Sequence, residues 1–83
     1  MERVLIEVYV PVLNLSYDVF IPHHPPVHEV LELLKRAVAE LSDGQYRPGE
    51  SAALCYRSDG SILDINQSAR RLGIHNGSRL MLI

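Results

Sequence analysis

This chain of 83 residues has one cysteine, no excess of basic residues and no long apolar run. Its single cysteine, Cys55, excludes the internal disulfides that stabilise many small secreted domains. A formal net charge of -2 gives no overall attraction for nucleic acid or anionic lipid. No apolar run approaches the roughly 20 residues that a membrane-spanning helix needs, and the N-terminus lacks the features of a signal peptide. We therefore expect a cytoplasmic, soluble protein with no nucleic-acid partner and no direct membrane insertion.

The chain also lacks the short motifs that accompany common catalytic sites. Neither a Gly-x-Ser-x-Gly turn nor a nucleotide-binding glycine loop is present. Nothing places a base beside Cys55, and packing in the interior or at a sheet edge is the commoner fate of a lone cysteine. We expect no catalytic residues, no cofactor and no enzyme activity, so the sequence predicts a binding domain.

The composition is that of an ordinary folded protein, with 47% hydrophobic and 22% charged residues. This balance argues against disorder. Because the chain is too short to build a second core, residues 1–83 are expected to form a single domain.

Alternation of apolar and polar residues predicts an antiparallel hairpin at the start of the chain. The first strand ends before Pro11 and has these inward-facing positions: Val4, Ile6, Val8 and Val10. The second strand ends before Pro22 and has these: Leu15, Tyr17, Val19 and Ile21.

A single amphipathic helix is predicted over residues 26–42. Pro25 and Pro26 suit a first helical turn, and Gly44 suits the left-handed conformation that commonly follows a helix. The apolar residues between them recur at helical spacing: Val27, Val30, Leu31, Leu34, Val38 and Leu41. This stripe is expected to pack on one face of the sheet.

The rest of the chain predicts short elements separated by turns. Residues 45–51 are expected to form a surface loop, residues 53–57 a strand and residues 62–64 a shorter strand. Residues 68–72 suit one helical turn, and residues 78–83 alternate as a final strand. The predicted fold class is therefore α+β, with a mixed sheet of about five strands and one main helix on one face.

This order of elements resembles the ubiquitin-like β-grasp fold over essentially the whole chain. The segments that carry the resemblance are Leu63-Asp64, Ser68-Ala69, Leu72-Gly73-Ile74 and Gly77-Ser78-Arg79-Leu80. Among such proteins, the chain most resembles the YukD/EsaB family of bacterial type VII (ESX) secretion. That resemblance implies a cytoplasmic accessory or regulatory component that binds membrane or ATPase parts of the secretion machinery.

The last residues indicate how such a protein would work. Ubiquitin-type carriers present a flexible C-terminal glycine for activation, whereas this chain ends on the alternating strand Arg79-Leu80-Met81-Leu82-Ile83. We therefore expect a non-conjugating protein that acts through protein–protein interaction. A sulfur-carrier relative, which would also need a terminal glycine, and a homo-oligomeric structural subunit remain alternatives.

Strand parity predicts an apolar patch on the sheet face opposite the helix. Strands one and five are neighbours in this topology, so the outward residues Leu5, Tyr9, Met81 and Ile83 are expected to cluster. Phe20 and Cys55 have the same parity, and Val12 and Leu13 in the hairpin loop would extend the surface. The predicted protein-interaction patch comprises Leu5, Tyr9, Val12, Leu13, Phe20, Met81 and Ile83. Scattered surface apolar groups, which are normal, are the alternative, and a homodimer through the same patch is another.

Three histidines gather near the predicted start of the helix. His24 and His28 have the i, i+4 spacing that a metal can use, and His23 precedes them. No cysteine or carboxylate lies beside them in the sequence with ligand spacing. We therefore expect solvated neutral histidines and no metal site, although the sequence leaves metal binding by His23, His24 and His28 open.

Overall fold

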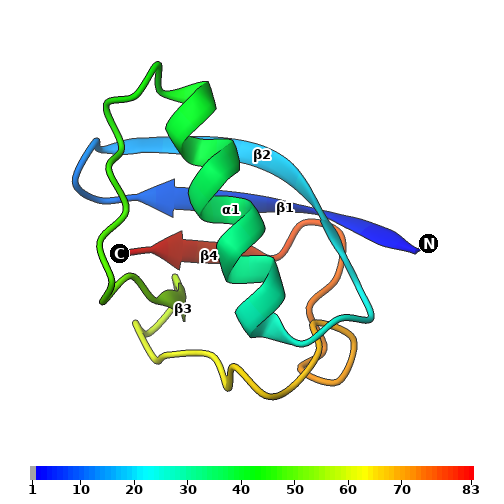
Figure 1. Ribbon diagram of the computed structural model, residues 1–83. Coiled ribbons are helices and arrows are strands. Elements are labelled where there is room, and N and C mark those ends of the chain that lie inside the picture. The colour runs from blue at the N-terminus through cyan, green and yellow to red at the C-terminus, as the bar shows by residue number, and fades with distance from the viewer. Residues whose placement is uncertain (1) are drawn as a thin grey trace.

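Four strands and one helix make up the fold in residues 2–83, which the computed structural model describes (Figure 1). In chain order they are β1 Arg3–Val10, β2 Leu15–Pro22, α1 Val27–Leu41, β3 Leu54–Tyr56 and β4 Arg79–Leu82. The sheet order is β2-β1-β4-β3, with β1 and β4 parallel and the other two neighbouring pairs antiparallel. The predicted α+β architecture, with one helix on one face of a mixed sheet, is confirmed, including the central pairing of the first and last strands.

The first two strands form the predicted hairpin. Their register runs from Arg3 opposite Pro22 to Val10 opposite Leu15, and the connecting turn has Asn14 at a φ of 52°. All four predicted inward residues of β1 are buried: Val4, Ile6, Val8 and Val10. In β2, Ile21 is buried but Leu15 is exposed, because β2 is an edge strand that the helix covers only in part.

The helix α1 matches its predicted limits to within one residue at each end, with Pro26 at its N-cap. The stripe Val27, Val30, Leu34 and Val38 is buried against the sheet, and Leu31 packs at its margin. Leu41 was expected in this stripe but is exposed, because it is the last residue of the helix and the chain turns away directly after it. Gly44 has a φ of 79°, and its N–H donates to the carbonyl of Ala39, as expected for a helix end.

The expectation of about five strands is corrected to four. Residues 62–64 form no strand, although Ile62 makes an isolated bridge with Cys55 and the Leu63 N–H donates to the Leu54 carbonyl over 2.9 Å. Residues 68–72 form turns closed by the Leu72 N–H to the Ser68 carbonyl at 3.1 Å. These segments are too short for the repeated backbone hydrogen bonds of a strand or helix, so each makes isolated contacts instead.

The segment that follows the helix is better anchored than the sequence suggested. Tyr46 lies in the predicted surface loop yet is buried, and burial raises the pKa of its phenol. Its backbone N–H donates to the hydroxyl of Ser42 over 2.9 Å. Aromatic burial therefore ties this loop to the end of α1.

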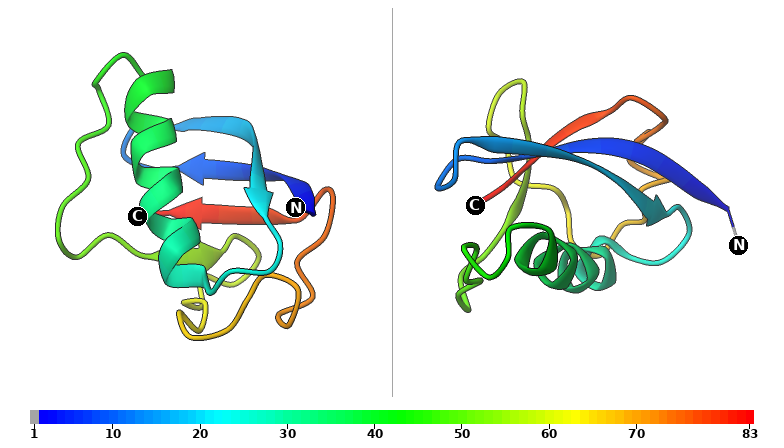
Figure 2. Two further views of the ribbon diagram at one scale, coloured as in Figure 1. Left: turned by 45° about the vertical axis from the view of Figure 1, so that its right-hand side comes forward. Right: turned by 90° about the horizontal axis from the view of Figure 1, so that it is seen from above.

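The helix covers one face of the sheet, and the core lies between the two layers (Figure 2). On the opposite side of the sheet, the segment that follows β3 rises over one end (Figure 2, right). The rest of that side carries the outward-facing residues of the strands and is here called the outer face. Across residues 2–83, no helix has the length and apolar character needed to cross a membrane.

Candidate functional site

The outer face contains two apolar groups that the strand register brings together. Leu5 on β1 lies opposite Phe20 on β2. Tyr9 on β1 lies opposite Met81 on β4. Because directly paired residues project from the same side of a sheet, each pair forms a local contact surface. The parity argument therefore placed these four residues on one common face.

A charged group lies between the two apolar pairs on the outer face. Glu7 has the same parity as Leu5 and Tyr9 and lies between them on β1. Its carboxylate accepts a hydrogen bond from the guanidinium of Arg57 over 2.6 Å. The same guanidinium lies 4.4 Å from the centre of the Tyr9 ring. Arg3 stacks in the same way on Phe20, at 5.1 Å from the ring centre.

The other predicted patch residues differ in how much of their surface is available. Val12 is 79% exposed at the tip of the hairpin, and Phe20 and Ile83 are 57% and 52% exposed. Leu13 does not extend the patch, because its side chain packs against the hydrophobic core. Val12 and Leu13 could not be told apart from the sequence, since both are apolar and neither has strand parity.

Cys55 has the parity of the outer face, yet it is fully buried, in line with the interior packing expected of a lone cysteine. It lies between Met81 on β4 and Ile62 on the returning segment, to which it is paired on either side. A short side chain flanked by two larger ones loses its access to solvent. Burial raises the pKa of the Cys55 thiol, so the neutral form predominates at physiological pH.

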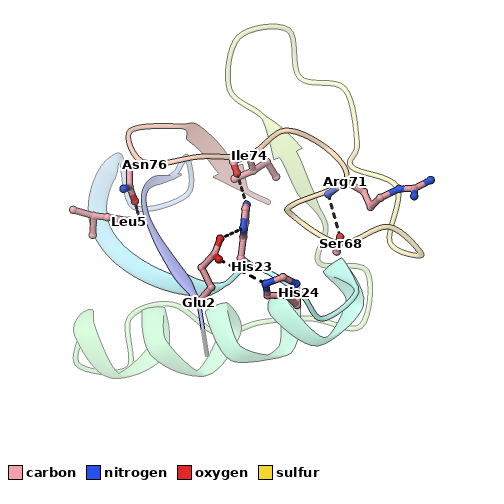
Figure 3. A network of polar contacts seen from close by, with 8 residues as sticks. All are labelled: Glu2, Leu5, His23, His24, Ser68, Arg71, Ile74 and Asn76. Carbon is pink, nitrogen blue, oxygen red and sulfur yellow. Dashed lines mark hydrogen bonds and ion pairs between the residues drawn. The ribbon is translucent and has the colours of Figure 1, made fainter.

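The histidines near the helix start meet a carboxylate that the sequence did not place beside them (Figure 3). Nδ1 of His23 lies 2.9 Å from Oε1 of Glu2, and Nε2 of His24 lies 3.9 Å from Oε2 of the same residue. Glu2 precedes β1, whereas both histidines follow β2, so the hairpin brings the three together. His28 is exposed and lies outside this group.

The turn before β4 is anchored to β1 by three hydrogen bonds. The backbone N–H of Leu5 donates to Oδ1 of Asn76 over 2.8 Å (Figure 3). The Gly77 N–H donates to the Leu5 carbonyl over 2.8 Å. The Glu7 N–H donates to the Ser78 carbonyl over 2.9 Å. The predicted Asn76-Gly77 turn thus fixes the position of β4, and with it Met81, beside β1.

Solved structures with similar folds are ubiquitin-like domains. The ubiquitin-like domain of the type VII secretion system protein EccD1 from Mycobacterium tuberculosis superposes with a TM-score of 0.81 at 15% identity, covering 100% of this chain and 99% of that chain. The EccD5 ubiquitin-like domain from Mycobacterium xenopi gives 0.74 at 19% identity, covering 100% and 94%. A chain of the ESX-5 inner membrane complex gives 0.70 at 23% identity, with 100% of this chain matching 21% of that one. At these identities the likeness establishes the fold.

The sequence itself establishes the family. No curated protein sequence matches this chain significantly. The family model described as "WXG100 protein secretion system (Wss), protein YukD" matches residues 5–82, which include all four strands or most of each. The chain therefore belongs to the YukD family of the WXG100, or type VII, protein secretion system.

Proposed function

We propose that this protein is a non-conjugating accessory or regulatory component of a type VII secretion system that acts in the cytoplasm by binding another protein. The family match over residues 5–82 carries the proposal, because it links the whole folded domain to this secretion machinery. The binding surface in this proposal is the outer face, with Leu5 and Phe20 at one end and Tyr9 and Met81 at the other.

The chemistry of the outer face supports a protein partner. Tyrosine, phenylalanine, methionine and arginine are enriched in protein interfaces, and the outer face presents all four types. Arg3 and Arg57 stack on aromatic rings, which holds their long side chains in place before a partner arrives. A partner would therefore lose little side-chain entropy on binding here.

The proposed partner is a membrane or ATPase component of the same machinery. A similar ubiquitin-like fold occurs within a chain of the ESX-5 inner membrane complex and within a protomer of the ESX-3 core complex. A free-standing domain of this kind would bind at such an assembly without catalysis and without a cofactor. A second copy of the chain is the alternative occupant of the face.

The backbone at Ile83 is hydrogen-bonded to the segment before β3. Its N–H donates to the Ala53 carbonyl over 3.0 Å and its carbonyl accepts from the Ala53 N–H over 2.9 Å. Residue 83 is thus held beside Ala53, and the protein is proposed to act without activation of a carboxylate. Intact mass after incubation with ATP and an activating enzyme tests this, and an adenylate or thiocarboxylate adduct would contradict it.

The binding face is tested by affinity purification from the native host, with membranes solubilised and co-purifying proteins identified by mass spectrometry. Leu5→Ser combined with Phe20→Ser removes one apolar group of the outer face, whereas Leu33→Ser combined with Leu41→Ser removes exposed leucines of α1. We expect secretion-system subunits to be lost with the first pair only. Retention with the first pair and loss with the second would place the interface on the helix.

A further inference from the structure

Glu2, His23 and His24 form a cluster in which one ligand-type atom from each side chain lies within 4.8 Å of the others. The two measured separations are 2.9 Å between His23 Nδ1 and Glu2 Oε1, and 3.9 Å between His24 Nε2 and Glu2 Oε2. Ligand atoms of a tetrahedral zinc ion, at bond lengths near 2.0–2.1 Å, lie about 3.4 Å apart. The two separations involve different oxygens of the Glu2 carboxylate and fall on either side of that value, so a rotation of the exposed Glu2 side chain would bring one oxygen within reach of both imidazoles.

His23 is held by the fold in the orientation that a metal ligand requires. Its backbone N–H donates to the Glu2 carbonyl over 3.1 Å, and its own carbonyl accepts from the Arg70 N–H over 3.0 Å. On the ring, Nε2 lies 2.9 Å from the carbonyl oxygen of Ile74 (Figure 3). A carbonyl can only accept, so Nε2 must carry the proton of this hydrogen bond.

This hydrogen bond leaves Nδ1 of His23 facing the Glu2 carboxylate. Either a second proton or a cation must lie between the two atoms, because a lone pair facing a carboxylate oxygen is repulsive. Metal-binding histidines commonly donate their other ring N–H to a backbone carbonyl, which fixes the ring and its tautomer. Ile74 has that role for His23, whose side chain is only 14% exposed.

The remaining two groups suit a cation that enters from solvent. Glu2 and His24 have side chains 62% and 51% exposed, so both can adjust and a coordination position stays open to water. The positive charge of Arg70 also acts on Glu2 and will weaken the affinity of this carboxylate for any cation.

We propose that Glu2, His23 and His24 bind a zinc ion, with water as the fourth ligand. Two imidazoles and one carboxylate are a ligand set that zinc accepts, and the ion would lie between Nδ1 of His23 and the Glu2 carboxylate. The bound ion would link the residue before β1 to the connection between β2 and α1. The proposal goes beyond the proposed function and does not depend on partner binding.

The test is a zinc titration of the full chain without a histidine tag, in competition with a chromophoric zinc indicator. We expect one zinc ion per chain and a thermal midpoint that rises with zinc concentration, because zinc binds the folded state. Glu2→Gln and His24→Gln change exposed side chains, so folding survives, and each is expected to weaken zinc binding by at least about tenfold. His28→Gln is the matched control and is expected to bind as the unsubstituted chain does.

Nitrogen-15 NMR of the imidazoles gives a second, independent measurement. We expect zinc to move the Nδ1 signal of His23 and the Nε2 signal of His24 while the signals of His28 and His75 stay unchanged. The proposal is overturned if zinc shows no saturable binding below about 1 mM, a dissociation constant equivalent to only about 4 kcal/mol. Equal zinc affinity in the unsubstituted chain, Glu2→Gln and His24→Gln would also overturn it.

Discussion

At the scale of single residues, Ser42 connects the helix to the loop that follows. Its hydroxyl donates to the Ala39 carbonyl over 3.3 Å and accepts from the Tyr46 N–H over 2.9 Å. Ser42 and Tyr46 are both buried, so water cannot replace the serine oxygen easily. One hydroxyl thus ends the helix and holds the buried tyrosine in place.

Removal of this one hydroxyl should lower the free energy of unfolding more than an exposed substitution does. In Ser42→Ala the buried Tyr46 N–H loses its acceptor, and we expect the free energy of unfolding to fall by about 1–3 kcal/mol. Urea denaturation measures the change. Ser16→Ala, at an exposed position of β2, is the control and should stay within about 0.5 kcal/mol. A Ser42→Ala protein as stable as this control would show that the hydrogen bond contributes nothing.

The Cys55 thiol should react slowly with alkylating or disulfide reagents at neutral pH. Burial both blocks access and raises the pKa of the thiol, so little thiolate forms and the reagent must wait for an opening of the structure. The rate with a disulfide reagent is measured in buffer and again in guanidinium, where the thiol is free. Equal rates in the two conditions would mean that the segment after β3 does not cover Cys55.

At the scale of elements, the helix α1 depends on one buried stripe. Leu34 is buried against the sheet, whereas its neighbour Leu33 is 43% exposed on the same helix. Leu34→Ala leaves a cavity and should lower the free energy of unfolding by about 2–5 kcal/mol. Leu33→Ala, the matched control, should change it by less than about 1 kcal/mol. Similar losses for the two variants, compared by urea denaturation, would contradict the observed helix orientation.

At the turn before β4, glycine is favoured at residue 77 by the backbone conformation and not by a lack of room for a side chain. Gly77 has a φ of +90° and its N–H donates to the Leu5 carbonyl, yet nothing lies within 4 Å of an added Cβ. Gly77→Ala is strained by its φ alone and should cost about 1 kcal/mol or more of unfolding free energy. Gly49→Ala has neither a positive φ nor a close contact, so it should be neutral or slightly stabilising. Thermal unfolding of the two variants compares them, and equal midpoints would refute the strain.

The elements were predictable from the sequence wherever a periodic pattern ran long enough. Alternation placed Val4, Ile6, Val8 and Val10 in the core, and the apolar stripe placed α1 to within one residue. The strand predicted at residues 62–64 is absent because a segment of three residues can form an isolated bridge as easily as a strand. Strand parity alone did not indicate the burial of Cys55 or the packing of Leu13, because both depend on segments distant from the strand pattern.

The outer face was predictable in part. Parity identified the common side of Leu5, Tyr9, Phe20 and Met81, and the same parity shows that Glu7 interrupts the apolar surface. Arg57 could not be placed over Glu7 and Tyr9, because its position depends on where β3 pairs with β4. The Glu2 and His23 contact likewise requires the hairpin register, which brings residues far apart in the sequence together.

At the scale of the whole molecule, the two sides of the sheet differ in what they contact and what they present to solvent. The helix covers one side of the sheet (Figure 2) and the core lies between them, while the other side presents apolar pairs and stacked arginines. Substitutions on the outer face should therefore change binding with little effect on stability, because exposed positions contribute little to folding. Such a separation would let a small domain carry the proposed interaction surface without weakening its own core.

The most direct measurement is photo-crosslinking in the native host from single positions on the two sides of the molecule. A photoreactive amino acid at Phe20 reports on the outer face, and one at Leu33 reports on the exposed side of α1. Mass spectrometry then identifies what each position captures. We predict that the Phe20 position crosslinks to a membrane or ATPase subunit of the type VII secretion system and that the Leu33 position does not. Capture of such a subunit from Leu33 alone, or of only a second copy of the chain from Phe20, would contradict the account.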